Sequence, residues 1–134
     1  MTTRSIDRVI DANLNRLREA LRLLEDIQRY IYDNRELSYA FKELRHKLTP
    51  LFDSKRLESR DIVNDVSKES TESEMQRTNI KALIAANFSR ATESARVLEE
   101  TFKLVDTSAS ATAKEIRYRL YNLEILVHKG LESE

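Results

Sequence analysis

One stretch of the sequence decides the fold: residues 10–31 read IDANLNRLREALRLLEDIQRYI. Its apolar side chains recur in alternating steps of four and three residues, which places them along one side of a long helix. The members of this seam are Ile10, Leu14, Leu17, Leu21, Leu24 and Ile31, with Gln28 in the one polar position. Such a helix has to bury its apolar side against other elements, so the stretch predicts a helical bundle.

The same pattern returns 74 residues later and predicts a duplicated helical hairpin. The second seam consists of Ile84, Phe88, Ala91, Ala95, Leu98, Phe102 and Val105. Each long helix is followed by a polar break, DN at 33–34 or DTS at 106–108, whose short side chains can cap the next helix. The following helices also match, because KELRHKL at 42–48 corresponds to KEIRYRL at 114–120. Their seams are Leu37, Phe41, Leu44, Leu48 and Leu51 in the first copy and Ala109, Ala113, Ile116, Leu120 and Leu123 in the second.

The composition narrows the class of protein. Only one glycine and one proline occur in 134 residues, which argues against a β-rich fold with many tight turns. The 23 basic and 23 acidic side chains balance, so no net field favours nucleic acid or an anionic membrane surface. The absence of cysteine excludes disulfides and thiolate metal sites. No apolar run is long enough for a signal core or a membrane span, so we expect a cytoplasmic protein.

We expect a single all-α domain over residues 1–134, a pseudo-twofold four-helix bundle built from the duplicated hairpin. Its parts are a first hairpin at about 5–57, a polar connection at about 58–74 and a second hairpin at about 75–132. First and third helices of about 28 residues would be about 40 Å long. Pro50 is expected to end or kink the second helix, with a further helical turn within 51–57. Thr71 and Glu74 have the spacing of a capping box for the third helix.

A polar pattern, N-x-x-R-x-x-E-x-x-R-x-L-E, occurs on both long helices, at 13–25 and at 87–99. At 100° per residue, its central arginine, glutamate and arginine point away from the apolar seam, so core packing does not dictate them. These residues are Arg16, Glu19 and Arg22 in the first copy and Arg90, Glu93 and Arg96 in the second, and the pattern begins and ends with Asn13, Glu25, Asn87 and Glu99. One interpretation is a ladder of surface ion pairs kept since the duplication. The other is that these donors and carboxylates bind a phosphate, a metal-bound phosphate or a partner helix.

The connection contains RDIVNDV at 60–66, where Asp61 and Asp65 lie four residues apart. Their carboxylates form either a capped turn with solvated charges or a Mg²⁺ or phosphate loop. Glu43 and His46 have the E-x-x-H spacing of di-iron bundles, but the second copy has Tyr118 in place of the histidine. With no second motif of this kind and no glycine-rich phosphate loop, neither a di-iron centre nor a familiar nucleotide-binding fold is expected.

Four motifs together resemble a known family: DANLNRLREALRLLED at 11–26, KELRH at 42–46, RDIVNDV at 60–66 and ANFSRATESARVLEETFK at 86–103. In this order they are similar to the all-helical domain at the N-terminus of some bacterial thiamine-phosphate synthases. The resemblance implies a role in thiamine biosynthesis, with the domain acting as an alternative hydroxymethylpyrimidine phosphate kinase. Such a reaction uses ATP, a phosphorylated pyrimidine and Mg²⁺, so it requires cationic donors and at least one carboxylate.

The resemblance also implies a set of site residues. Substrate and phosphates would be bound by Asn13, Arg16, Glu19, Arg22, Glu25, Arg45, Arg60, Asn87, Arg90, Glu93, Arg96, Glu99 and Lys103, while Asp61 and Asp65 would hold Mg²⁺ and act with His46 in catalysis. Ser67 stands where the family pattern has glycine, which would remove a tight backbone approach to phosphate. The alternative is a non-catalytic helical module that pairs with a second copy or with a thiamine-phosphate synthase. Because neither His46 nor the 60–66 loop has a counterpart in the second half of the sequence, any catalytic chemistry is expected at one end of the bundle.

Overall fold

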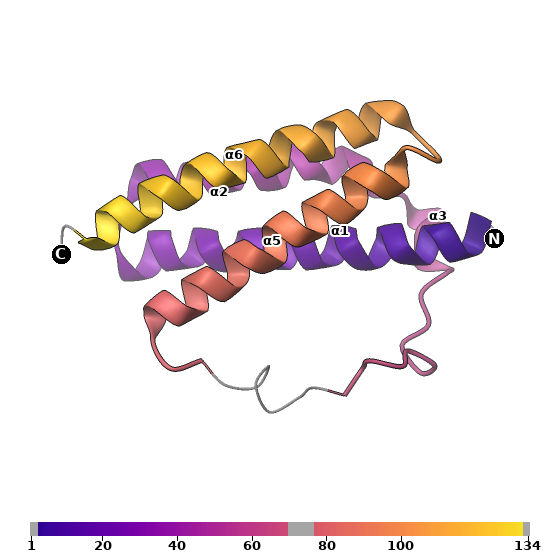
Figure 1. Ribbon diagram of the computed structural model, residues 1–134, viewed down its shortest axis with the longest axis horizontal. Coiled ribbons are helices and arrows are strands. Elements are labelled where there is room, and N and C mark those ends of the chain that lie inside the picture. The colour runs from indigo at the N-terminus through magenta and orange to yellow at the C-terminus, as the bar shows by residue number, and fades with distance from the viewer. Residues whose placement is uncertain (1–2, 70–76, 133–134) are drawn as a thin grey trace.

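The computed structural model describes residues 3–69 and 77–132, and within these ranges all regular secondary structure is helical. Four long helices in these ranges carry the fold (Figure 1): α1 (Thr3–Asp26), α2 (Arg35–Leu48), α5 (Ile80–Phe102) and α6 (Thr107–Glu132). Short segments accompany them: a π-helix at Ile27–Ile31, a 3-10 helix at Thr49–Leu51 and α3 (Ser54–Leu57). None of the helices in the described ranges is long and apolar enough to cross a membrane. The predicted all-α class is confirmed.

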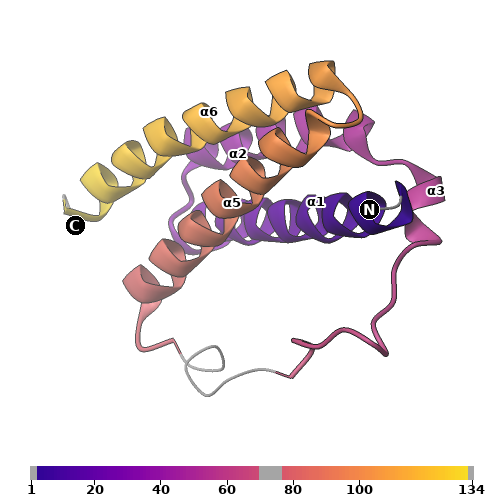
Figure 2. The same cartoon turned by 45° about the vertical axis from the view of Figure 1, so that its right-hand side comes forward.

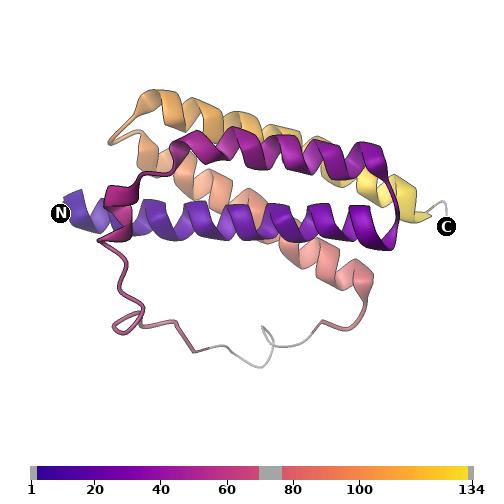
Figure 3. The ribbon, with the colours of Figure 1, turned by 180° about the vertical axis from the view of Figure 1, so that it is seen from behind.

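The long helices enclose one hydrophobic core, and the seams found in the sequence supply most of it. α1 lies beside α2 and α5, and α6 lies beside the same two helices, so α1 and α6 occupy diagonal corners (Figures 1 and 3). Phe41 of α2 meets Phe88 of α5 along the other diagonal, with 5.8 Å between ring centroids, and neither ring is exposed. Each buried side chain of this size contributes about 1.5–3 kcal/mol to stability.

The polar breaks end one helix and cap the next, as predicted. Asn34 caps α2, because its Oδ1 accepts a hydrogen bond from the backbone N–H of Leu37 at 3.0 Å. Asp106 caps α6 in the same way, accepting from the N–H groups of Ser108 and Ala109 at 3.0 and 3.2 Å. Each cap satisfies backbone donors that an α-helix leaves unpaired at its start.

Helix α5 has 23 residues and is shorter than predicted. Its N-cap is Asn79, whose Oδ1 accepts from the backbone N–H of Ala82 at 2.8 Å. The capping box predicted at Thr71 and Glu74 lies outside the described residues. Val105 follows the end of α5 and is 49% exposed, so its assignment to the apolar seam is wrong.

A π-helical turn changes the register at the end of α1. Ile31, the last residue of the predicted seam, is 57% exposed, whereas the polar Gln28 is only 4% exposed. The turn at Ile27–Ile31 has more residues per turn than an α-helix, so by its last residue, Ile31, the side chain is rotated relative to the seam. The prediction that Ile31 belongs to the core is therefore wrong.

Pro50 ends α2, as predicted. The α-helix stops at Leu48 and gives way to the 3-10 turn, because proline lacks the N–H that the next α-helical hydrogen bond requires. Helix α3 then supplies the expected further turn and contacts α1. The described part of the connection that follows, residues 58–69, leads away from α3 on the side of the bundle where α1 and α5 lie (Figure 1).

Candidate functional site

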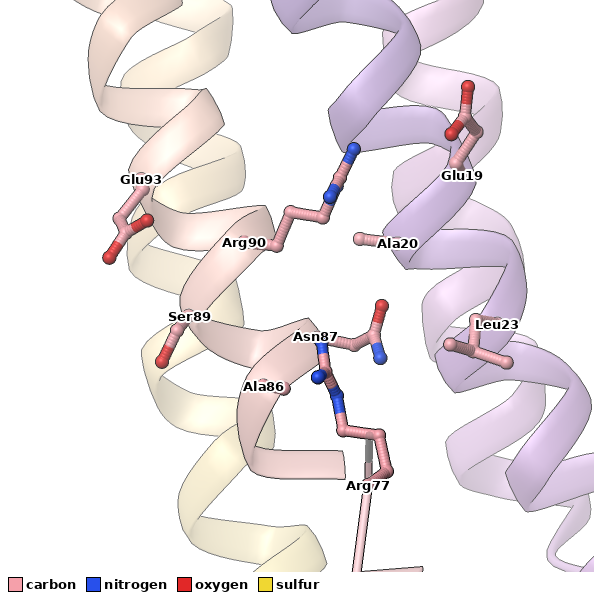
Figure 4. A pocket seen from close by; sticks show the side chains of 9 residues that line it. All are labelled: Glu19, Ala20, Leu23, Arg77, Ala86, Asn87, Ser89, Arg90 and Glu93. Atoms are coloured by element: carbon pink, nitrogen blue, oxygen red, sulfur yellow. The ribbon is translucent and has the colours of Figure 1, made fainter. Parts of the chain in front are cut away.

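A cleft of about 470 Å³ opens between the C-terminal half of α1 and the N-terminal half of α5 (Figure 4). These halves meet because the two helices run in opposite directions (Figure 1). Its volume is within the range of small-molecule sites, about 300–1,000 Å³. The lining residues are Glu19, Ala20 and Leu23 from α1, Ala86, Asn87, Ser89, Arg90 and Glu93 from α5, and Arg77 from the segment before α5. The polar patterns of both long helices therefore contribute to one cleft.

Arg90 is the cation best placed to bind an anion in this cleft. Its side chain extends from α5 toward α1 and lies near the small side chain of Ala20 (Figure 4). Within the part of the chain that the structure describes, no carboxylate pairs with its guanidinium. A planar guanidinium presents five N–H donors in a fixed fork, which suits the paired oxygens of a phosphate.

Arg77 and Asn87 add polar groups at one end of the cleft. Figure 4 shows Arg77 reaching from the segment before α5 toward Asn87, which lies between it and Arg90. The Asn87 side-chain nitrogen donates to the backbone carbonyl of Leu83 at 2.9 Å, which fixes the orientation of the amide. Sequence reasoning missed Arg77, because it precedes the helical pattern and no periodicity marks it.

Two carboxylates complete the lining. Glu19 belongs to α1 and Glu93 to α5, and both side chains are exposed (Figure 4). They point away from each other on opposite sides of the cleft (Figure 4), so they do not form one shared metal site. Mg²⁺ bound to phosphate needs as few as one carboxylate, since phosphate oxygens and water fill its other positions. The cleft thus combines donors for an anion with one carboxylate on each side.

The first-copy counterparts of Asn87 and Arg90 do not line the cleft. Asn13 is buried and donates to the backbone carbonyl of Val9 at 2.9 Å, repeating the bond that Asn87 makes in the second copy. Arg16 is exposed, and its Nη1 lies 3.5 Å from Oδ1 of Asn13. Corresponding residues therefore have different surroundings, and the cleft occupies one end of the α1–α5 pair.

Two buried ion pairs join the helices at corresponding positions of the two copies. Arg45 Nε donates to Oε1 of Glu25 at 2.9 Å. In the second copy, Arg117 donates from Nε and Nη2 to Oε2 of Glu99, at 3.0 and 2.8 Å. The two glutamates are 3% and 5% exposed. These side chains link neighbouring helices and do not line the cleft, although the sequence assigned three of them to substrate binding.

The predicted ladder of surface ion pairs forms only in part. Arg96 pairs with Glu99, three residues later, at 3.3 Å. Among the described residues, neither Arg16 nor Arg90 forms the corresponding pair with the glutamate three residues later. The ladder therefore does not account for the arginine in the cleft.

Three other predicted site residues are not among those that line the cleft. His46 is exposed on α2, which lines no part of it. Arg22 lies 3.6 Å from Asp26 in an exposed pair near the end of α1. Lys103 follows α5 and pairs with Glu100 at 3.0 Å, at the opposite end of that helix from the cleft.

The loop at 60–66 is attached to the first half of α1. Arg60 donates from Nε and Nη2 to the two carboxylate oxygens of Asp11, at 2.9 and 3.0 Å, and this bond raises the pKa of Arg60. Asp11 precedes the first α1 residue of the cleft, Glu19, by eight positions, or about 12 Å of helix. The loop and the cleft are therefore separate features.

The carboxylates of the loop form capped turns. Asp61 accepts from the backbone N–H and the side-chain amide of Asn64, and these bonds lower its pKa. Asp65 accepts from the backbone N–H of Ser67 at 3.0 Å. Within the described ranges, no group of three or more histidine, aspartate or glutamate side chains is placed to hold a metal ion. This geometry agrees with the capped-turn interpretation of the sequence.

Glu99 makes stability depend on pH. Burial raises the pKa of Glu99, but hydrogen bonds and charges from Arg117 and Arg96 outweigh it, so the net pKa is below its ordinary value. Such a group stabilises the fold above its unfolded pKa, about 4.3, and this contribution is lost as pH falls through the folded pKa. We expect urea titrations to give a smaller free energy of unfolding at about pH 3 than at about pH 5. The loss should be smaller in Glu99→Gln, and an equal loss in both proteins would contradict the assignment.

The fold and the cleft define a class of protein: an all-α domain with an arginine-containing cleft of small-molecule size. The model of the ThiD2 family matches residues 8–126, and the chain belongs to this family.

Its curated relatives include thiamine-phosphate synthases of cyanobacteria. The protein of Synechocystis sp. (strain ATCC 27184 / PCC 6803 / Kazusa) is 45% identical over 121 residues, which are 90% of this chain and 35% of the relative. Those of Thermosynechococcus vestitus and Nostoc punctiforme are 40% and 38% identical over 118 residues, 87% of this chain and 34% of each relative. The chain thus spans about a third of the length of these relatives. No solved structure matches it. The family resemblance inferred from the four motifs is confirmed.

Proposed function

We propose that this chain is a thiamine-biosynthesis domain that phosphorylates hydroxymethylpyrimidine phosphate with ATP in the cytoplasm. The observation that carries the proposal is Arg90, which enters a cleft of about 470 Å³ without a carboxylate partner among the described residues. The relatives of the chain are thiamine-phosphate synthases, which supports a phosphorylated pyrimidine as the ligand. The four sequence motifs resemble the helical domain of such synthases, and this resemblance implies a kinase for that compound.

The reaction transfers the γ-phosphoryl group of ATP. An oxygen of the pyrimidine's phosphate forms a bond to the γ-phosphorus, while the bond from that phosphorus to the oxygen bridging the β-phosphate breaks, giving the pyrimidine diphosphate and ADP. Because little covalent chemistry is left to the protein, catalysis depends on positioning and charge stabilisation. Arg90 and Arg77 would bind phosphate oxygens, and the Asn87 carbonyl oxygen can accept from a pyrimidine amino group.

The proposal moves the metal ligands from the loop to the cleft. Mg²⁺ would arrive bound to the phosphates of ATP and take one carboxylate of the cleft, Glu19 on α1 or Glu93 on α5, because these two point away from each other (Figure 4). Asp61 and Asp65 use carboxylate oxygens to cap turns instead. When bound, the ion neutralises charge on the phosphates. The protein's own groups hold the two substrates in line and exclude part of the surrounding water.

The test is a kinase assay with ATP, Mg²⁺ and hydroxymethylpyrimidine phosphate, following the diphosphate by ³¹P NMR and ADP by a coupled reaction. We expect turnover by the purified chain and a loss of kcat/KM of about 100-fold in Arg90→Ala, the magnitude typical for removing one charge-stabilising donor. Lys42→Ala removes an exposed cation from α2 and should retain full activity. Absence of turnover, together with no thermal shift by either substrate, would overturn the proposal.

A non-catalytic role is the second candidate, favoured by the fact that these relatives are named thiamine-phosphate synthases and not kinases. The domain would then act as a helical module that binds a thiamine-phosphate synthase. If the chain has this role, the immobilised chain should capture a thiamine-phosphate synthase, and Arg90→Ala should not change the amount captured. Turnover with no capture would decide for the kinase.

A further inference from the structure

The outward side of α6 carries a second regular pattern, here called the outer seam. Its members follow one another in steps of four, three, four, three and four residues: Lys114, Tyr118, Tyr121, Ile125, His128 and Glu132. All six are exposed, and the three apolar members have exposed fractions of 57%, 41% and 54% in chain order. The core residues of α6 lie on its other side, so the outer seam does not belong to the bundle core.

Two tyrosines of the outer seam are held in a fixed arrangement. The rings of Tyr118 and Tyr121 meet edge to face with 6.0 Å between centroids. The guanidinium carbon of Arg117 lies 4.9 and 5.8 Å from their centroids, and the buried Glu99 anchors this arginine. Tyrosine and arginine predominate among the residues that contribute most binding energy at interfaces. Groups that are ordered before binding lose less entropy when a partner arrives.

The fold itself does not require an apolar outer seam. The corresponding positions of α2 and the segment after it, 72 residues earlier, are Lys42, His46, Thr49 and Asp53. This side of the first copy is polar, although the same hairpin architecture carries it. Apolar side chains at these exposed positions in one copy only therefore indicate a role outside the folding of the hairpin.

The outer seam is also accessible to a large partner. α6 contacts α5 and α2 and lies diagonally opposite α1, so one side of it faces away from the other long helices (Figure 1). Figure 2 shows that the C-terminal part of α6 extends beyond the neighbouring helices. A second helix can therefore pack along the outer seam without displacing any element described here.

We propose that the outer seam joins two copies of the chain, with α6 packing antiparallel against α6 of the second copy. Alternating steps of four and three are the spacing by which paired helices interlock. When the twofold axis passes midway between Tyr121 and Ile125, each of these residues faces the other across the interface. Tyr118 then faces His128, and Lys114 faces Glu132. Opposite charges meet at both ends of the seam, and this complementarity selects a second copy as the occupant.

Sedimentation equilibrium of the 134-residue chain tests the interface. We expect a monomer–dimer equilibrium with a dissociation constant in the micromolar range, because a single helix pair is a small interface. Ile125→Lys places charges at the centre of the seam and should raise the dissociation constant at least tenfold, with unchanged circular dichroism. Tyr39→Lys, at a 59% exposed position of α2, is the matched control and should not change it. A monomer at every concentration, or equal effects of the two variants, would overturn the proposal.

A charge exchange tests the antiparallel register. Lys114→Glu should weaken the dimer several-fold, because two glutamates would then meet at each end. Adding Glu132→Lys should restore the original dissociation constant in an antiparallel pair. In a parallel pair each position meets its own copy, so the double variant would not recover and the register would be refuted. A chain that stays monomeric, but whose outer seam is covered when a thiamine-phosphate synthase is added, would assign the surface to that partner instead.

Discussion

Replacing Phe88 with alanine is expected to lower the free energy of unfolding by about 3–5 kcal/mol. Phe88 has no exposed surface, and its ring packs against Phe41 at a centroid distance of 5.8 Å. The two rings connect α5 with α2 across the centre of the bundle, where the helices themselves are diagonal neighbours. Removing one ring leaves a cavity that four surrounding helices cannot close. The loss is a large fraction of the roughly 5–15 kcal/mol that stabilises a domain.

Urea titration followed by circular dichroism measures this effect. Tyr39→Ala is the matched control, because it removes an aromatic side chain from α2 that is 59% exposed. Its cost should stay within about 0.5 kcal/mol. Equal midpoints for the Phe88 and Tyr39 variants would show that the diagonal contact does not organise the core.

The apolar spacing of the sequence was sufficient to predict the long helices and the side that each of them buries. It failed where helix geometry departs from 3.6 residues per turn. Ile31 is the last residue of the π-helical turn and is rotated out of the core, while Val105 lies beyond the end of α5. A periodic pattern assumes a constant rotation per residue, so it cannot signal either change.

The cleft was predictable only in part. The repeated polar pattern identified Asn87 and Arg90, because outward identities on an amphipathic helix are not dictated by packing. It did not identify Arg77, and it placed the loop aspartates in the same site. Residues of α1 and α5 that line the cleft together are more than 60 positions apart in the sequence. They meet only because of how the two helices pack, and the periodicity of a single helix holds no information on that packing.

The pattern also could not separate surface ligands from structural ion pairs. Glu25 and Glu99 lie at the border of the seam, where a side chain turns either to solvent or to a neighbouring helix. Their partners, Arg45 and Arg117, follow 20 and 18 residues later on the next helix of each hairpin. The correspondence of the two pairs supports the predicted duplication, because both use matching positions of KELRHKL and KEIRYRL.

Glu99→Gln should lower the free energy of unfolding by about 3 kcal/mol at neutral pH. Oε2 of Glu99 accepts from Arg117 at 3.0 and 2.8 Å and from Arg96 at 3.3 Å, in a side chain that is 6% exposed. An amide of the same shape removes the charge but leaves Arg117, itself only 12% exposed, with much of its charge uncompensated. Glu25→Gln should cost less, because among the described residues only Arg45 donates hydrogen bonds to that carboxylate.

Two further variants determine whether the cost comes from the buried pair. Glu43→Gln breaks an exposed pair with Arg119, at side-chain exposures of 45% and 38%, and should cost no more than about 0.5 kcal/mol. Replacing both partners, with Glu99→Leu and Arg117→Met, removes the charges together and should recover most of the stability lost in Glu99→Gln. Urea titrations at pH 7 compare the free energies of unfolding of these variants with that of the unmodified protein. If Glu99→Gln lowers the free energy of unfolding no more than Glu43→Gln does, the Glu99–Arg117 pair does not hold α5 to α6. If the double variant is less stable than Glu99→Gln, the loss of stability comes from lost packing and not from an unpaired charge.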